Sequence, residues 1–302
     1  MWHKARSSQG YFDVDPAKLV VLFGNKPYVN VRNAFNSFIP NSISKDLREK
    51  LLTFYLDKLE NNPEFQDKVE FDVLYTCYDF SFDSRSKELL DFGFTQDEVN
   101  VFKKSLLELT NNLLSNSKKA MEEDLVEVNK LDKLRSELSY DDKEDLQKAL
   151  NKVKMLLDNC KSYGTLQFSR LARLAFIGKI LLKSLVNKKV ISEGDYHNFL
   201  SSISTVATDM NNDFILLKKG EIDNNKFLLK YGHLRPGTYD ITCSRYESNP
   251  SLLKGAQNLS KTFENQVSFS LDENIHKKIS AMLKEEGFNF DSEFLFNFIK
   301  ST

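Results

Sequence analysis

The chain of 302 residues carries 42 basic and 43 acidic residues and has a formal net charge of -1. A nucleic-acid clamp needs a net basic surface that releases counterions, so this balance argues against one. Only 11 glycines and 6 prolines are present, which disfavours turn-dense β-sandwiches and barrels and favours long helices. With 41% hydrophobic residues, and 24 Phe in the chain, we expect a substantial core.

The three cysteines, Cys77, Cys160 and Cys243, lie too far apart in the sequence for a zinc motif, and their odd number fits no closed set of disulfides. We therefore expect no metal site and a reducing compartment. Residues 171–186 are the most apolar stretch but include three basic side chains, and no apolar run follows the basic residues near the N-terminus. A cytoplasmic location without a membrane partner is the resulting expectation.

The first predicted elements are a helix and a strand. Apolar residues at helical spacing predict an amphipathic helix over residues 47–59. Residues 69–75 place apolar and acidic side chains on alternate sides, the period of a half-buried strand. Asp79 and Asp83 follow this predicted strand and fit either acid–base groups or ordinary turn acids, of which we favour the turn acids.

Helical periodicity dominates the following residues. It runs from residue 84 to about 130, with a break at 94–95. Residues 117–157 alternate charges and predict a helix hairpin with solvated outer faces, and residues 164–186 predict the central helix of a bundle. Further helices are expected over residues 192–217 and 224–232, and two shorter ones beginning near residues 271 and 291.

Residues 232–250 form the longest irregular stretch, since glycine and proline interrupt them repeatedly. His233, Arg235, Asp240 and Arg245 lie within this loop, and long polar loops usually serve binding or chemistry. Arginine supplies planar donors for phosphate or carboxylate, and His or Asp can move a proton, so one interpretation is an anion-handling site. In the other, the arginines pair with nearby acids, His233 caps the preceding helix and the loop only ties two helices together.

Three further arginines are candidates for the wall of an anion pocket. Arg32 lies among the asparagines and aromatic residues of 28–38, which fit either a polar wall or an Asn-rich helix start. Arg170 and Arg173 stand three residues apart on a helix that is otherwise apolar. Because a buried arginine needs an anionic partner, they indicate either a binding site or ion pairs with core-facing acids such as Asp79.

The loop sequence YGHLRPGTYDITCSRY resembles the motif of phosphoenolpyruvate-synthase-like enzymes in capsule and lipopolysaccharide gene clusters. Four more blocks look like the same family in the same order: PYVNVRNAFNSFIP, EFDVLYTCYDF, GTLQFSRLARLAFIGKILLKSLV and SSISTVATDM. Within that family the chain is most similar to the L-glutamine kinases of capsular phosphoramidate synthesis. Relatives tend to have Ser-Pro where Cys243 and Ser244 stand and His where Leu174 stands, a departure that concerns substrate identity.

The resemblance implies a three-part enzyme, with an ATP-grasp domain that binds ATP, a helical middle domain and a swivelling domain that carries a phosphorylated histidine. This chain looks like the middle part, a single helical acceptor-substrate domain over residues 1–302. The sequence contains no P-loop, GxGxxG, nucleophile-elbow or HExxH motif. ATP and Mg²⁺ are therefore expected on the ATP-grasp domain and none on this chain, which by itself should be inactive.

The implied roles divide the candidate residues into two groups. An amide nitrogen is a poor nucleophile, so transfer to it relies on positioning, charge stabilisation and a proton acceptor. We expect His233 or Asp240 to take the proton. The expected substrate-binding residues, which should converge on one concave surface, are Arg32, Arg170, Arg173, Arg235 and Arg245.

The sequence thus predicts a mainly α, helical bundle-like domain with a minor β element. It would serve as the acceptor-substrate domain of an ATP-dependent phosphotransferase that phosphorylates L-glutamine, with ATP-grasp and phosphohistidine domains as partners. In one alternative, the acceptor is pyruvate or phosphoenolpyruvate. In the other, the chain is a non-catalytic helical interaction module, whose loop arginines would all be paired internally with no open pocket beside them.

Overall fold

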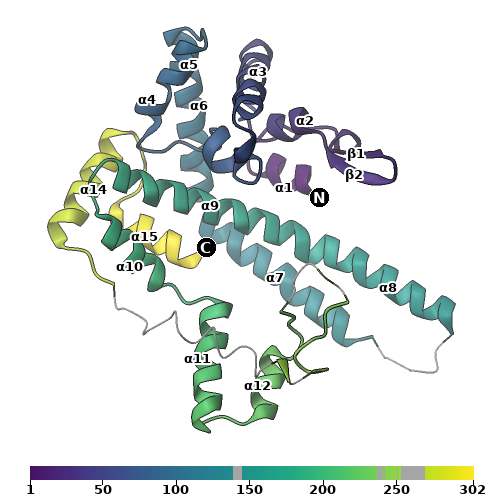
Figure 1. Cartoon of the computed structure of the whole chain (residues 1–302). Coiled ribbons are helices and arrows are strands. Elements are labelled where there is room, and N and C mark those ends of the chain that lie inside the picture. The colour runs from purple at the N-terminus through teal and green to yellow at the C-terminus, as the bar shows by residue number, and fades with distance from the viewer. Residues whose placement is uncertain (139–144, 237–239, 241, 250, 253–268) are drawn as a thin grey trace. The chain divides into compact units, whose positions relative to one another are not determined.

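Helices dominate the computed structural model (Figure 1), which describes residues 1–138, 145–236, 240, 242–249, 251–252 and 269–302. Within these residues the only sheet is an antiparallel hairpin of β1 (Val20–Phe23) and β2 (Lys26–Val29). The expected mainly α fold with a minor β element is confirmed, although the β element lies at the hairpin. In this described part of the chain, no helix is both long and apolar enough to cross a membrane.

The chain divides into two compact units, a larger one of Met1–Ser192 with Asp272–Thr302 and a smaller one of Glu193–Leu271. The single domain expected over residues 1–302 stays a prediction. The helices of the larger unit are α1 (Trp2–Ser8), α2 (Val31–Asn36), α3 (Lys45–Asn61), α4 (Phe82–Arg85), α5 (Lys87–Asp91), α6 (Gln96–Ser115), α7 (Ser117–Ser136), α8 (Leu146–Cys160), α9 (Leu166–Asn187), α14 (Glu273–Glu285) and α15 (Ser292–Ser301). The helices whose bounds lie in the described residues of the smaller unit are α10 (Glu193–Ser201), α11 (Val206–Lys219) and α12 (Asn224–Tyr231).

Local capping explains why two of the predicted helices begin where they do. The Ser44 side chain accepts a hydrogen bond from the Leu47 N–H at 3.4 Å and caps α3. At the predicted break, Thr95 and Glu98 form a capping box at the start of α6. The helix expected over residues 47–59 and the break at 94–95 are both confirmed.

The predicted strand over residues 69–75 is wrong. Residues Val69–Val73 form a π-helical turn, closed by the Leu74 N–H, which donates to the Val69 carbonyl at 2.9 Å. A strand needs a neighbouring strand for its backbone groups, and the described residues pair none with this segment. The alternation instead reflects a buried Val73 and an acid, Glu70, that contacts arginines.

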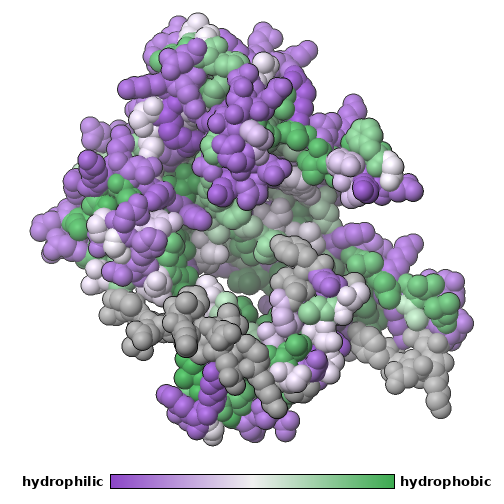
Figure 2. Space-filling model, viewed as in Figure 1, coloured by the Kyte–Doolittle hydropathy of each residue, from purple (hydrophilic) through white to green (hydrophobic). Residues whose placement is uncertain are grey.

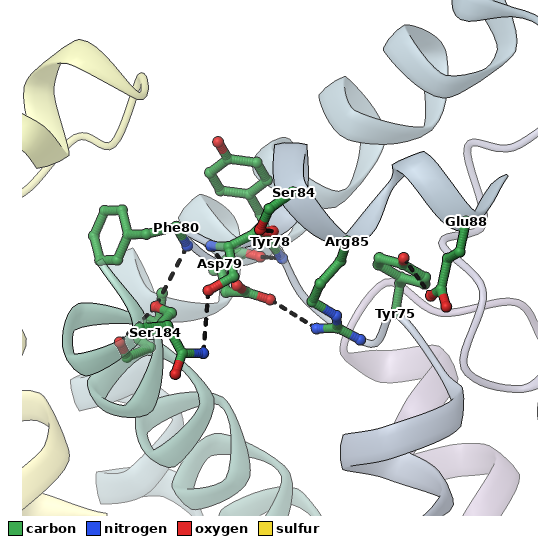
Figure 3. Close-up of polar contacts among 12 residues, drawn as sticks. Tyr75, Tyr78, Asp79, Phe80, Ser84, Arg85, Glu88 and Ser184 are labelled. Atoms are coloured by element: carbon green, nitrogen blue, oxygen red, sulfur yellow. Dashed lines mark hydrogen bonds and ion pairs between the residues drawn. The ribbon is translucent and has the colours of Figure 1, made fainter. Parts of the chain in front are cut away.

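The segment after this turn, residues 74–82, is buried without forming a strand or a helix until residue 82. Its backbone groups therefore need side-chain partners. The Tyr78 N–H donates to the Thr110 hydroxyl of α6 at 2.9 Å, and the Phe80 N–H donates to the Ser184 hydroxyl of α9 at 3.4 Å (Figure 3). Hydroxyl groups on two helices thus take the place of a partner strand.

Asp79 also serves this segment as a turn acid (Figure 3). Its carboxylate accepts the Ser81 N–H at 2.6 Å and an Arg85 N–H at 3.0 Å. Burial raises the pKa of the Asp79 carboxyl, and the Arg85 guanidinium opposes that rise. Beside them, the Tyr75 hydroxyl donates to Glu88 at 2.6 Å. The turn interpretation of Asp79 is confirmed, and its ion-pair partner is Arg85.

α8, a π-helical turn at Lys161–Thr165 and α9 follow one another without a break, and α7 packs along the resulting rod (Figure 1). The expected hairpin and the apolar helix over 164–186 are confirmed, but the outer faces are not uniformly polar. Apolar residues lie at the surface where α8 runs (Figure 2). Exposed side chains at helical spacing form this α8 stripe, namely Leu146, Leu150, Val153 and Leu157.

The single helix expected over residues 192–217 is two helices. α10 ends at Ser201, and α11 begins after Thr205, whose hydroxyl accepts the Thr208 N–H at 3.1 Å. A threonine cap of this kind starts a new helix because it satisfies a backbone N–H that has no helical partner. The helices expected over 224–232 and near residues 271 and 291 are present as α12, α14 and α15.

The three cysteines should differ sharply in reactivity. Cys77 is buried, and burial raises the pKa of its thiol to about 12, whereas Cys160 is exposed and Cys243 is half-buried. Since the thiolate is the nucleophile, we expect alkylation of Cys77 at pH 8 to be at least about a hundredfold slower than that of Cys160. Timed labelling with iodoacetamide and peptide mass spectrometry measures this. Equal rates for these two thiols would contradict the packing, and denaturant should abolish the difference.

Candidate functional site

The predicted loop is attached to the smaller unit at both of its ends. The Tyr246 N–H donates to the Leu234 carbonyl at 3.1 Å, and the Glu247 N–H donates to the Gly232 carbonyl at 3.0 Å. A Cβ atom at Gly232 would lie 2.4 Å from the Leu228 carbonyl oxygen and 3.0 Å from the Glu247 Cβ, so the end of α12 and the close return of the chain both favour glycine here. Tyr246 completes the buried aromatic cluster of this unit with Phe214, Phe227 and Tyr231.

Asp240 forms a turn within the loop. Its carboxylate accepts the Thr242 hydroxyl at 2.6 Å and the Thr242 N–H at 2.9 Å, and its carbonyl accepts the Cys243 N–H at 3.1 Å. The hydrogen bonds from Thr242 lower the pKa of the Asp240 carboxyl, with a smaller contribution from the charge of Arg235. A carboxylate stabilised in this way is a weaker proton acceptor.

The loop arginines differ from each other. Arg245 pairs with Glu247 at 2.9 Å, and both side chains are about half exposed. The Nε of Arg235 is buried and has no hydrogen-bond partner among the described residues. His233 is exposed, and no described residue hydrogen-bonds to its ring, so it does not cap α12. The pairing of Arg245 fits a loop that only ties two helices together, and the unpaired Nε of Arg235 fits an anion-handling site. Residues 237–239, 241 and 250 of the loop lie outside the described residues.

Arg32 lies at the surface of the larger unit. It pairs with Glu49, and both side chains are about half exposed. The Asn30 side chain caps α2 by accepting the Asn33 N–H at 3.1 Å. The Asn-rich helix start is confirmed, and the substrate-binding role expected of Arg32 stays a prediction.

Arg170 holds a buried acid and borders a cleft. Its Nε donates to Asp124 at 3.1 Å and its Nη2 to the other carboxylate oxygen, with Asp124 2% exposed. Both residues line a cleft of about 610 Å³. The cleft is also lined by Leu174 and by Gln9, whose Oε1 is buried without a partner in the described residues.

Arg173 lies on the same helix but is more deeply buried. Its Nη1 donates to Glu70 at 2.7 Å. The other oxygen of Glu70 lies 3.5 Å from Nη2 of Arg6, an arginine of α1 that also donates to the Ser37 hydroxyl. One carboxylate therefore serves two buried guanidinium groups.

The five predicted binding arginines thus have distinct surroundings. Arg32, Arg170 and Arg173 each hold a different acid, and none of these acids is the Asp79 that the sequence offered as a partner. Their convergence with the loop on one surface stays a prediction. Sequence reasoning missed Arg6, Glu70 and Asp124, because the only local sign was that the buried arginines required acids from elsewhere in the chain.

No metal site emerges from the parts of the chain that the structure describes, since they hold no suitable group of three or more His, Cys, Asp or Glu residues. Comparisons with family models, with curated proteins and with solved structures found no match for this chain. The family hypothesis therefore depends on the sequence blocks quoted above.

Proposed function

We propose that this chain is the acceptor-substrate domain of a phosphoenolpyruvate-synthase-like, ATP-dependent phosphotransferase of the cytoplasm, with L-glutamine as the acceptor. ATP and Mg²⁺ would bind to an ATP-grasp partner, and a phosphohistidine domain would deliver the phosphoryl group. The resemblance of the loop and of four other blocks supports the family, and the loop geometry supports anion binding.

The observation that carries the proposal is the buried Nε of Arg235, which has no hydrogen-bond partner among the described residues. A buried N–H without a hydrogen bond costs stability, and an anionic ligand would supply the missing acceptor. Arg235 lies near enough to Asp240 to lower the pKa of that carboxyl, yet no hydrogen bond joins the two side chains. Arg235 therefore retains donors for the carboxylate of an amino acid or for a phosphoryl group.

The geometry favours His233 over Asp240 as the proton acceptor of this reaction. Asp240 already accepts two hydrogen bonds from Thr242, whereas the imidazole of His233 is exposed and has no described partner. Imidazole is also the side chain that most often takes a proton in catalysis, whereas a carboxylate stabilised by hydrogen bonds is a weaker acceptor.

Isothermal titration calorimetry of the full chain with L-glutamine, pyruvate and phosphoenolpyruvate tests the proposal. We expect L-glutamine to bind, and Arg235→Ala to weaken this binding by about tenfold or more, as for loss of a hydrogen bond to a charged group. Tm should change little. Arg135→Ala is the matched control, because Arg135 is an exposed arginine of α7.

Other outcomes decide between the alternatives. Heat with pyruvate or phosphoenolpyruvate but none with L-glutamine would transfer the proposal to the first alternative acceptor. No heat with any of the three would contradict an acceptor-binding role of the isolated chain. The α8 stripe, with its exposed leucines and valine, favours the interaction module in that case.

A further inference from the structure

Two arginines of α9 use their side chains in different ways. The Nε and Nη2 atoms of an arginine form the edge that holds a carboxylate or phosphate through two parallel hydrogen bonds. In Arg170 this edge is filled by Asp124. In Arg173 both atoms of the edge are buried and have no partner among the described residues. Arg173 therefore has an empty bidentate edge inside the larger unit.

The charge around this empty edge is not balanced. The side chains of Arg173 and Arg6 are 3% and 7% exposed, and Glu70 is the only acid paired with either of them in the described structure. Two cations and one carboxylate leave one net positive charge in the cluster. Burying a charge without full compensation is costly, so the cluster favours a second anion.

Neighbouring aromatic rings relieve this imbalance only in part. The guanidinium of Arg6 lies 3.3 Å from the ring centre of Phe38, and that of Arg173 lies 5.6 Å from the same ring. Cation–π contacts stabilise charge but satisfy none of the free N–H groups at the edge. Burial, the largest cause, lowers the pKa of Arg6 to about 9, and the positive charge of Arg173 adds to this effect.

We propose that the Nε–Nη2 edge of Arg173, with Arg6 beside it, binds the oxyanion group of a small molecule, either a carboxylate or a phosphoryl group. Two adjacent donors match two oxygens of one anion, which a single water molecule or a chloride ion cannot provide. Glu70 is the most exposed member of the cluster, at 23%. The site lies within the larger unit and does not rest on the proposed function.

Titration of the full chain with inorganic phosphate and, separately, with acetate tests this site, with chloride at matched ionic strength as the reference. We expect at least one oxyanion to raise Tm in a saturable manner beyond the effect of chloride. Saturation at a lower concentration of phosphate than of acetate would identify the phosphoryl class, and the reverse order would identify the carboxylate class. No saturable difference from chloride in either arm would overturn the proposal.

Variants place the binding at Arg173. Arg173→Lys keeps the charge but removes the two-donor edge, so we expect the affinity for the oxyanion, measured by the same Tm titration, to fall at least about tenfold. Arg170→Lys is the matched control, because its edge is occupied by Asp124, and its response should stay near that of the wild type. Equal responses of the two variants would overturn the assignment.

Glu70→Gln keeps the test decisive if Arg173→Lys does not fold. Removing the competing negative charge should tighten oxyanion binding severalfold, and unchanged or weaker binding would count against the site. Arg235→Ala distinguishes the two proposals, since it should reduce L-glutamine binding and leave the oxyanion response of the larger unit intact. Loss of the oxyanion response in Arg235→Ala would overturn the Arg173 assignment.

Discussion

Arg170→Ala should lower the free energy of unfolding by about 3–5 kcal/mol, because it leaves a buried carboxylate without its cation. Asp124 is 2% exposed, and both of its oxygens accept hydrogen bonds from the guanidinium of Arg170. Urea denaturation followed by circular dichroism measures the change. Arg135→Ala should cost less than about 0.5 kcal/mol, since Arg135 pairs with Asp132 at the exposed surface of α7.

A double substitution separates the charge from the packing. Asp124→Leu combined with Arg170→Met removes both charges and keeps apolar volume, so it should recover most of the lost stability. A loss of stability in Arg170→Ala as small as that in Arg135→Ala would contradict the burial of Asp124 that the structure shows. If the double variant stays as unstable as Arg170→Ala, the cost lies in packing instead of the unpaired charge.

Phe82→Ala should destabilise the larger unit by about 3–5 kcal/mol through the cavity that it leaves. The Phe82 side chain is fully buried, and its ring centre lies 5.6 Å from that of Tyr75, 5.7 Å from that of Tyr78 and 6.1 Å from that of Phe102. Thermal and urea denaturation measure the loss. Phe82, Tyr75 and Tyr78 belong to the buried segment that α6 and α9 hold, and Phe102 lies on α6, so the loss should appear in the main unfolding transition.

Phe168→Ala is the control for this core substitution. Phe168 lies on α9 and is 72% exposed, so its removal should change stability by less than about 0.5 kcal/mol. A similar cost for both phenylalanines would mean that the aromatic cluster around Phe82 is not the core of the larger unit.

The helices were predictable because their determinants are local. Apolar spacing marked α3, α6 and α9, and short-range caps such as Thr95 with Glu98 explain where a helix starts. The predicted strand failed for the complementary reason, since alternation over residues 69–75 describes which side chains are buried but not whether a partner strand exists. The β1–β2 hairpin escaped prediction because both of its strands are short and mostly exposed.

The sequence likewise predicted only part of the candidate site, because some of its determinants are local and others are not. The chemistry of the loop was readable from residue types, and the need of Arg170 and Arg173 for acids followed from their apolar surroundings. The acids themselves could not be predicted, because Asp124 lies 46 residues from Arg170 in the sequence and Glu70 lies 103 residues from Arg173. Arg170 and Arg173, three residues apart on one helix, therefore had equivalent sequence signatures.

The sequence by itself determined a mainly α chain, the position of most helices and the requirement that buried arginines be paired with anions. These properties depend on composition and on the spacing of residues along the chain, which are the same in any conformation. Only the tertiary structure decided that Asp124 fills the bidentate edge of Arg170, while that of Arg173 has no partner among the described residues. Ion pairs between distant residues form only when packing brings their side chains together, so their outcome belongs to the fold and not to the local sequence.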